Sequence, residues 1–154
     1  MSSLDERDHE PHVRRAIRLA RRAGDRGDGP YGSVLVRDGD VVMEDTNREH
    51  TDDDIALHPE LTLARRAARE LDAGERAEAV MYTSTEPCPM CAGAIAIAGL
   101  GGVVYSVSAA ALAEAFGGPE SVPCGEIFER RGREIPVVGG VLDEEGLALH
   151  REFR

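Results

Sequence analysis

Residues 85–95 of the chain read Thr-Glu-Pro-Cys-Pro-Met-Cys-Ala-Gly-Ala-Ile, and residues 58–60 upstream read His-Pro-Glu. Cys88 and Cys91 stand three residues apart, so at the start of a helix both sulfur atoms can face one point. The imidazole of His58 can supply a third ligand at that point. Zinc accepts this set of nitrogen and sulfur ligands in tetrahedral geometry. The sequence therefore predicts a Zn2+ site formed by His58, Cys88 and Cys91.

Three protein ligands leave the fourth position of a tetrahedral zinc ion open to water, which the metal makes nucleophilic near neutral pH. Glu60 lies two residues after His58 and is better placed to carry protons than to bind the metal. It can take a proton from the water and deliver it first to a ring nitrogen and then to departing ammonia. The pattern predicts a catalytic zinc site with Glu60 as its catalytic residue.

Other interpretations of the same residues stay open at this point. The zinc site could be a closed structural one whose fourth ligand is Cys124, His50 or another histidine, or no metal could bind. The Cys-x-x-Cys pair alone could be a redox pair. A structural site has no use for a glutamate beside its histidine, and a redox pair needs no upstream histidine, so the catalytic interpretation is favoured.

Length and composition predict one compact domain over residues 1–154, because 154 residues with 42% hydrophobic content can bury a sizeable core. No stretch approaches roughly 20 continuous apolar residues, and residues 1–10 are polar and acidic, so we expect neither a membrane span nor a signal peptide. An odd count of three cysteines does not favour a disulfide framework. These features predict a soluble protein of the reducing cytoplasm.

The charge balance bears on the class of partner. Acidic residues outnumber basic ones by 29 to 18, which gives a formal net charge of −11, and every basic residue is arginine. This charge opposes loose binding to nucleic-acid phosphates, although the same composition also fits a high-salt cytoplasm or a GC-rich genome. Arginines at 14, 15, 18, 21 and 22 fill one face of the first predicted helix. We interpret them as a solvated surface rather than an RNA-contacting stripe.

The apolar pattern predicts strands that alternate with helices, and hence a three-layer α/β/α fold around a mostly parallel or mixed sheet. Asp38-Gly39 predicts a tight hairpin turn, and Pro59 suits the first turn of a helix. The expected strands are 33–36, 41–43, 79–84, 103–107 and 135–138. The first expected helix begins near residue 13 and is ended by residues 25–30. The other expected helices are 59–71, 92–98 (entered by a loop over 86–91), 109–116 and 143–153, with an irregular stretch over 119–125.

The His-x-Glu motif at residues 58–60 and the Pro-Cys-x-x-Cys motif at residues 87–91 resemble the signature of the cytidine deaminase-like superfamily. The resemblance is closest to the branch of bacterial guanine deaminases, yeast-type cytosine deaminases and tRNA adenosine deaminases, and it covers roughly residues 13–107. It implies a three-layer α/β/α sandwich with a central mixed five-stranded sheet, and a homodimer. It also implies zinc ligation by His58, Cys88 and Cys91 and a proton shuttle at Glu60.

The resemblance further implies residues that bind the substrate. Asn47 matches an asparagine whose amide can donate to a ring carbonyl or ribose oxygen and accept from an N–H, although Asn47 could instead only form a turn. The backbone near Ser33 and the carbonyl of Glu86 would line the pocket. Pro59 departs from the Ala or Gly of most relatives, and it lacks the N–H that can hold a substrate oxygen there.

The segment around residues 124–128 has two interpretations. It could fold over the pocket and place Glu126 or Phe128 on the substrate, or it could be a structural loop around the buried thiol of Cys124. The chain after residue 107 shows no basic helix end that would grip an anticodon stem.

The leading functional interpretation is hydrolytic deamination of a free nucleobase or nucleoside of the guanine, cytosine or adenine type, with release of ammonia, as in purine or pyrimidine salvage. The second is deamination of adenosine to inosine in a tRNA anticodon loop, which the Arg-rich first helix supports and the net charge opposes. The third is a catalytically silent zinc-binding member of the fold, against which the presence of Glu60 argues.

Overall fold

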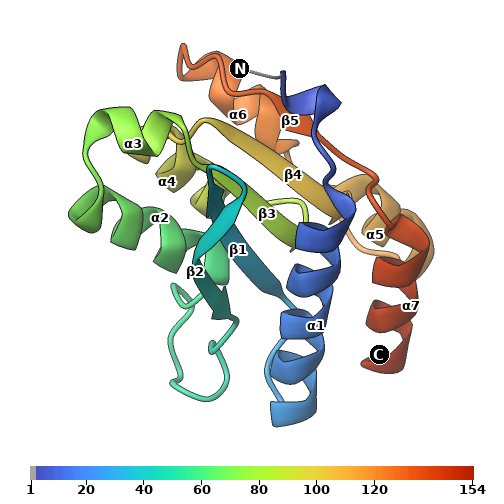
Figure 1. The fold of residues 1–154 in the computed structure, drawn as a ribbon. Helices are drawn as coiled ribbons and strands as arrows, with labels where there is room; N and C mark the ends of the chain where they lie inside the picture. The colour runs from blue at the N-terminus through green and yellow to red at the C-terminus, as the bar shows by residue number, and fades with distance from the viewer. Residues whose placement is uncertain (1–2) are drawn as a thin grey trace.

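The computed structural model describes residues 3–154, which form a central sheet between layers of helices (Figure 1). The strands are β1 (Gly32–Arg37), β2 (Asp40–Thr46), β3 (Val80–Thr85), β4 (Gly102–Val107) and β5 (Val137–Val138). Their order in the sheet is β2-β1-β3-β4-β5. β1 runs antiparallel to both of its neighbours, whereas β3, β4 and β5 are parallel. The expected mixed five-stranded sheet is confirmed.

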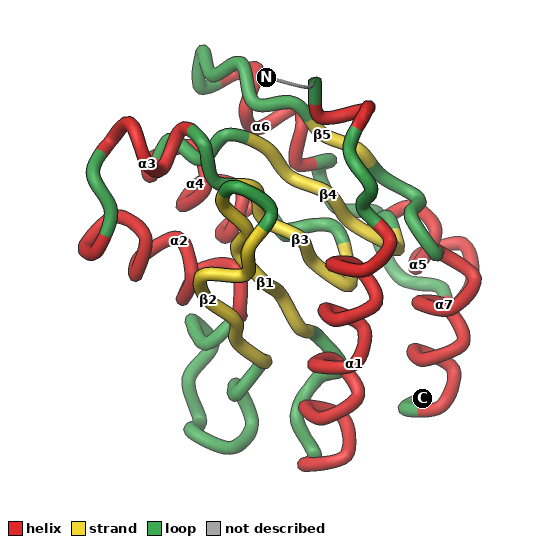
Figure 2. The backbone as a smooth tube through the Cα atoms, viewed as in Figure 1, coloured by secondary structure: helices red, strands yellow, loops and turns green. Residues whose placement is uncertain are grey.

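Helices cover both faces of this sheet, as the ribbon and the tube both show (Figures 1 and 2). One face carries α1 (Glu10–Arg26) and α7 (Asp143–Glu152). The other carries α2 (Pro59–Glu70), α4 (Pro89–Ala98) and α6 (Cys124–Arg130). The shorter elements are α3 (Ala73–Ala77), α5 (Ala109–Phe116) and a 3-10 turn (Leu4–Glu6). The three-layer α/β/α architecture is therefore confirmed.

The alternation of side chains along the central strands creates two separate apolar cores. In β1, Val34 and Val36 pack toward α1, whereas Leu35 packs toward α2 and α4. In β3, Tyr82 joins the α1 side and Met81 the opposite side. Successive strand residues point to opposite faces, so a strand that helices cover on both faces needs apolar residues at consecutive positions. This explains the consecutive apolar residues at 34–36 in β1, 80–82 in β3 and 103–104 in β4.

Several expected boundaries were wrong. The helix expected at 92–98 begins at Pro89, because proline occupies a first helical position well. The last strand is only Val137–Val138, and α3 was not expected. Residues 119–125 were expected to be irregular, but α6 begins at Cys124. Its start is fixed by a distant carboxylate, described below, that local sequence does not reveal.

Residues 1–10 were expected to be a polar start, and the structure describes them from Ser3 onward, so Met1 and Ser2 lie outside the described residues. Within residues 3–154, none of the helices has both the length and the apolar character needed to cross a membrane.

Gly32, at the start of β1, permits the close approach of α1 to the sheet. A Cβ atom at this position would lie 2.5 Å from the backbone oxygen of Ala16 and 2.5 Å from the backbone nitrogen of Ala20. Because these are backbone atoms, they cannot turn aside as a flexible side chain does. We expect Gly32→Ala to lower the free energy of unfolding by about 1–3 kcal/mol, measured by urea denaturation.

Gly125→Ala is the matched control for this prediction. A Cβ at Gly125 would have its nearest neighbour, the Val137 Cγ2 atom, at 3.9 Å, which is ordinary contact. We expect this variant to stay within about 1 kcal/mol of the wild type. Equal stability of the two variants would contradict the packing argument.

Candidate active site

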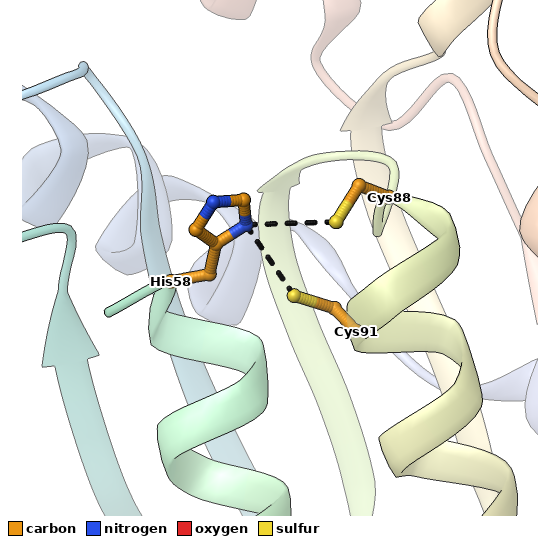
Figure 3. A group of neighbouring side chains, drawn as sticks. All are labelled: His58, Cys88 and Cys91. Carbon is orange, nitrogen blue, oxygen red and sulfur yellow. Dashed lines mark hydrogen bonds between the residues drawn. The ribbon is translucent and has the colours of Figure 1, made fainter. Parts of the chain in front are cut away.

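The three expected metal ligands meet at the N-terminal ends of two neighbouring helices (Figure 3). His58 is the residue that caps α2, Cys88 caps α4, and Cys91 lies in the first turn of α4. The Nδ1 atom of His58 is 3.5 Å from the Sγ atom of Cys88 and 3.5 Å from the Sγ atom of Cys91. All three donor atoms lie within 4.8 Å of one another.

This geometry fits a zinc ion. With zinc–sulfur bonds of about 2.3 Å and zinc–nitrogen bonds of about 2.0–2.1 Å, tetrahedral coordination places neighbouring nitrogen and sulfur ligands about 3.6 Å apart. The observed spacing of 3.5 Å matches that value. No further His, Cys, Asp or Glu among residues 3–154 belongs to the same group of donor atoms. Three ligands of this kind suit an open zinc site better than a closed one.

The local backbone prepares the sulfur atoms for a cation. The N–H of Cys91 donates to the Cys88 sulfur, and the N–H of Leu61 donates to the Cys91 sulfur. Hydrogen bonds from Cys91 and His58 lower the pKa of Cys88 to about 4, whereas the bond to Cys88 together with burial raises the pKa of Cys91. The hydrogen bond with Cys88 raises the pKa of His58 to about 9. The cluster thus holds a thiolate, the form that binds zinc.

Glu49 orients the histidine and was missed by the sequence analysis. Its Oε1 atom lies 2.5 Å from the Nε2 atom of His58, on the side of the ring away from the cysteines. A carboxylate on one ring nitrogen fixes which nitrogen faces the metal. Since Glu49 is part of an acid-rich stretch, residues 49–54, nothing in the linear sequence separates it from solvated charges.

The loop that carries Glu49 is anchored by Asp28, a buried carboxylate after α1. Asp28 accepts hydrogen bonds from the backbone N–H groups of His50 and Thr51, from the Thr51 hydroxyl and from Arg26. Burial alone would raise the pKa of Asp28, but the bonds from Thr51 and Arg26 hold it well below its usual range. Arg26 also donates to the backbone oxygen of Asn47. These contacts tie the loop to the fold on both sides of Glu49.

Glu60 is buried, with 6% of its surface exposed, and it lies beside the metal ligands at the start of α2. Ser33 donates from its hydroxyl to the Oε1 atom of Glu60 at 3.1 Å, and the Ser33 hydroxyl lies 2.8 Å from that of Thr83. Burial raises the pKa of Glu60 to about 7, although its own backbone N–H and Ser33 oppose the shift. A carboxyl group with a pKa near neutrality can both accept and deliver protons.

A cavity of about 220 Å³ opens in front of these residues. Its lining includes Glu60, His58 and Cys88 together with Asn47 and Glu49. Its remaining walls come from Tyr31, Pro59, Thr85, Glu86, Ala109, Leu112 and Ser121. The volume is smaller than the roughly 300–1,000 Å³ of sites for drug-sized ligands, so it suits a single small ring.

The expected substrate-binding residues divide into two groups. Asn47 and Glu86 line the cavity, as expected, and Asn47 also forms a turn because its Oδ1 atom accepts the N–H of Glu49 at 2.9 Å. Ser33 lies behind Glu60 and is absent from the cavity wall, so its contact is with the carboxyl group.

The segment around residues 124–128 does not reach the cavity. Glu126 is exposed and pairs with Arg130. Phe128 and Cys124 are buried in the core on the side of α2 and α4. The alternative interpretation of a structural segment around a buried thiol therefore describes this region better. His50 and Cys124 also lie outside the metal cluster, so neither serves as a fourth ligand.

Glu86 has a second role that the sequence analysis missed. Its Oε1 atom accepts the N–H of Ala109 at 3.0 Å and its Oε2 atom accepts the N–H of Cys124 at 2.9 Å. These are the first residues of α5 and α6. A carboxylate at a helix N-terminus satisfies free N–H groups and complements the helix dipole. One side chain thereby fixes the start of α6 and the helix that supplies Ala109 and Leu112 to the cavity.

The C-terminal helix α7 supports the cavity from behind. The Nε2 atom of buried His150 lies 3.0 Å from the Thr85 hydroxyl, and the Tyr31 ring lies against the His150 ring with centroids 5.6 Å apart. Both Thr85 and Tyr31 line the cavity. Burial lowers the pKa of His150 to about 4, so the ring stays neutral near pH 7.

Comparisons with known proteins identify the family. The sequence model of the cytidine and deoxycytidylate deaminase zinc-binding region matches residues 6–107. The chain belongs to this zinc deaminase family. It is 40% identical to guanine deaminase from Bacillus subtilis over 108 residues, 70% of this chain and 69% of that protein. It is 31% identical to the tRNA-specific adenosine deaminase of the same organism over 150 residues, 94% of this chain and 90% of that protein.

The fold of this deaminase is also similar to that of solved structures. Guanine deaminase from Nitrosomonas europaea superposes with a TM-score of 0.77 at 26% identity, covering 95% of this chain and 84% of that one. The resemblance found in the sequence is therefore confirmed, and with it zinc as the cofactor of the family domain. The three clustered donors, His58, Cys88 and Cys91, are its candidate ligands.

We expect His58→Ala and Cys88→Ala to lose zinc, measured by elemental analysis of the purified deaminase after dialysis. Loss of a residue that merely orients a zinc ligand weakens binding about 10–100-fold, and removal of a ligand is expected to exceed that. Cys124→Ala is the matched control, since this thiol is buried in the core outside the donor cluster. Zinc loss in Cys124→Ala equal to that in Cys88→Ala would contradict the assignment.

Proposed function

We propose that this chain, as a single catalytic unit over residues 1–154, hydrolytically deaminates a free nucleobase or nucleoside of the guanine, cytosine or adenine type. The observation that carries the proposal is a buried carboxyl group, Glu60, which lies beside three zinc-type donors and lines a small cavity together with two of them, His58 and Cys88. A site that only stabilised the fold would need neither the carboxyl group nor the cavity. Guanine deaminase activity in relatives of known function supports a small-ring substrate.

The reaction replaces a ring C–NH2 group by C=O, with water as the source of oxygen and ammonia as the leaving group. Zinc, when bound, supplies the Lewis acidity that makes water nucleophilic near neutral pH. Glu60 takes the proton that water loses, passes it to a ring nitrogen, and later delivers a proton to the departing amino group. Ser33 is a positioning residue, because its hydroxyl donates to the Oε1 atom of Glu60 and so helps to hold the carboxyl group in place.

The tRNA-specific alternative has support in the similarity that extends over 150 residues. Two observations favour the small molecule. Three arginines of α1 pair with carboxylates rather than standing free: Arg14 with Glu145, Arg15 with Glu44 and Arg21 with Glu152. The net charge of −11 also opposes approach to a polyanion.

We expect the zinc-loaded enzyme to release ammonia from one member of a panel of guanine, cytosine, adenine, their nucleosides and a tRNA. Glu60→Gln should lower the turnover rate by about 10²–10⁴-fold while retaining zinc, because the amide cannot transfer the proton. Activity confined to the tRNA, with a steep loss at higher salt, would support the alternative. Silence of a zinc-replete enzyme across the panel would contradict the proposal and favour a non-catalytic role.

We further propose that the homodimer expected from the resemblance forms through α4. This helix carries no charged residue, and Met90 and Ile97 are 40% and 68% exposed. They lie seven residues apart, and Gly93 and Ala94 lie between them on the same helix face. An exposed apolar stripe of this kind is typical of a protein interface.

Ile97→Glu is expected to shift this dimer to a monomer in size-exclusion chromatography with light scattering, because dimerisation would then bury an unpaired charge. Val42→Glu is the control, since Val42 is also partly exposed but lies on β2. A wild type that is monomeric at micromolar concentration would refute the dimer.

A further inference from the structure

The start of α2 has no N–H group left to hold a ring carbonyl. Pro59, the first helical residue, has no N–H and lines the cavity. The N–H of Glu60 bonds to its own carboxyl group, and that of Leu61 bonds to the sulfur of Cys91. The N–H of Thr62 donates to the backbone oxygen of His58. A substrate oxygen at this helix end would therefore find no backbone donor.

Two further residues of the cavity wall, Asn47 and Glu49, bond to each other and leave a carboxylate oxygen as an acceptor. The Asn47 amide is held by Glu49: its Oδ1 atom accepts the Glu49 N–H, and its Nδ2 atom donates to the Oε1 atom of Glu49 at 3.2 Å. Asn47 keeps one further N–H for a ligand. The Oε2 atom of Glu49 accepts no hydrogen bond from residues 3–154, and Glu49 lines the cavity with a side chain that is 39% exposed.

Apart from His58 and the metal that it would bind, the side chains that line the cavity give this carboxylate no cationic partner. None of the lining residues within the described range 3–154 is an arginine, and the chain has no lysine. A carbonyl oxygen that approached Asn47 would gain one neutral N–H donor and would lie beside an anionic oxygen. An amino group or ring N–H at the same place would donate to that anionic oxygen, and such charge-assisted bonds are the stronger kind.

We propose that Glu49 is a specificity-determining residue, which selects rings that present an amino group or ring N–H, rather than a carbonyl oxygen, toward Asn47 and Pro59. The inference rests on the proposed function, because it names the substrate subclass of the same site. Pro59 and Glu49 act together in it: the first removes the donor that a carbonyl needs, and the second supplies the acceptor that an amino group needs.

The test uses two purines that share a 2-amino group and differ along the N1–C6 edge. Guanine carries an N1–H and a C6 carbonyl there, whereas 2,6-diaminopurine carries a bare N1 and a C6 amino group. Their binding to the full-length zinc-loaded Glu60→Gln protein is measured by equilibrium dialysis at micromolar ligand, so that neither ligand is consumed. We expect 2,6-diaminopurine to bind about tenfold more tightly, or better, because its C6 amino group can donate to Glu49, whereas the C6 oxygen of guanine can only accept.

Two changes in this background probe the two halves of the proposal. Glu49→Gln should bring the two dissociation constants within about threefold of each other, since the amide loses the anionic acceptor. Pro59→Ala should tighten guanine binding by restoring an N–H at the cavity. Asp52→Asn is the matched control, because Asp52 belongs to the same loop and is exposed but does not line the cavity. Asp52→Asn should leave the ratio of the two dissociation constants unchanged.

The outcomes separate the inference from the function on which it rests. Two outcomes overturn the inference alone, provided that both purines bind. In the first, guanine binds more tightly than 2,6-diaminopurine. In the second, Glu49→Gln retains its full zinc content and leaves the ratio of the two dissociation constants unchanged. If Glu49→Gln loses its zinc, the Pro59→Ala variant decides instead. The inference is then overturned if Pro59→Ala binds guanine no more tightly than the Glu60→Gln parent. Binding of neither purine, together with no ammonia release by the wild type from any substrate of the panel, overturns the proposed function as well.

Discussion

Two helix N-termini, those of α2 and α4, meet on one face of the sheet, and each begins in the same way. His58 caps α2 and is followed by Pro59, while Cys88 caps α4 and is followed by Pro89. A proline restricts the preceding residue to extended backbone and suits the first helical position itself. Each ligand that caps a helix is thereby held in one backbone conformation before any metal binds.

The positions of Cys91 and Glu60 follow from the packing of these two helix N-termini. Cys91 shares the first turn of α4, so its sulfur joins the pair without a further loop. Glu60 shares the first turn of α2 and is buried under the same two helices, which is why its pKa is raised. The sheet supplies the floor, because the Ser33 hydroxyl from β1 bonds to Glu60. The metal site and the proton carrier are thus products of one packing arrangement.

Local sequence was sufficient for most of the helices and strands and for the candidate metal ligands, because each depends mainly on residues close together in the chain. The spacing of Cys88 and Cys91 and the apolar runs of the central strands act over a few residues. The side-chain roles of Glu49 and Glu86 were not predicted, because each depends on residues that are brought together only by the fold. Glu49 is one acid among several, and only the fold places it on His58. Glu86 was expected to act through its carbonyl, but its side chain joins residues 109 and 124, which lie 23 and 38 positions away.

Pro59 links the metal-ligand geometry to the cavity wall in this chain. Proline at this position stiffens the backbone of His58 but leaves residue 59 without an N–H on the cavity wall. Glu49 bonds to the other nitrogen of the same histidine and lines the same cavity. The carboxylate that orients the metal-binding histidine is therefore also part of the cavity wall. The geometry of the candidate metal ligand and the polarity of the cavity wall thus depend on one side chain, and a substitution of Glu49 changes both.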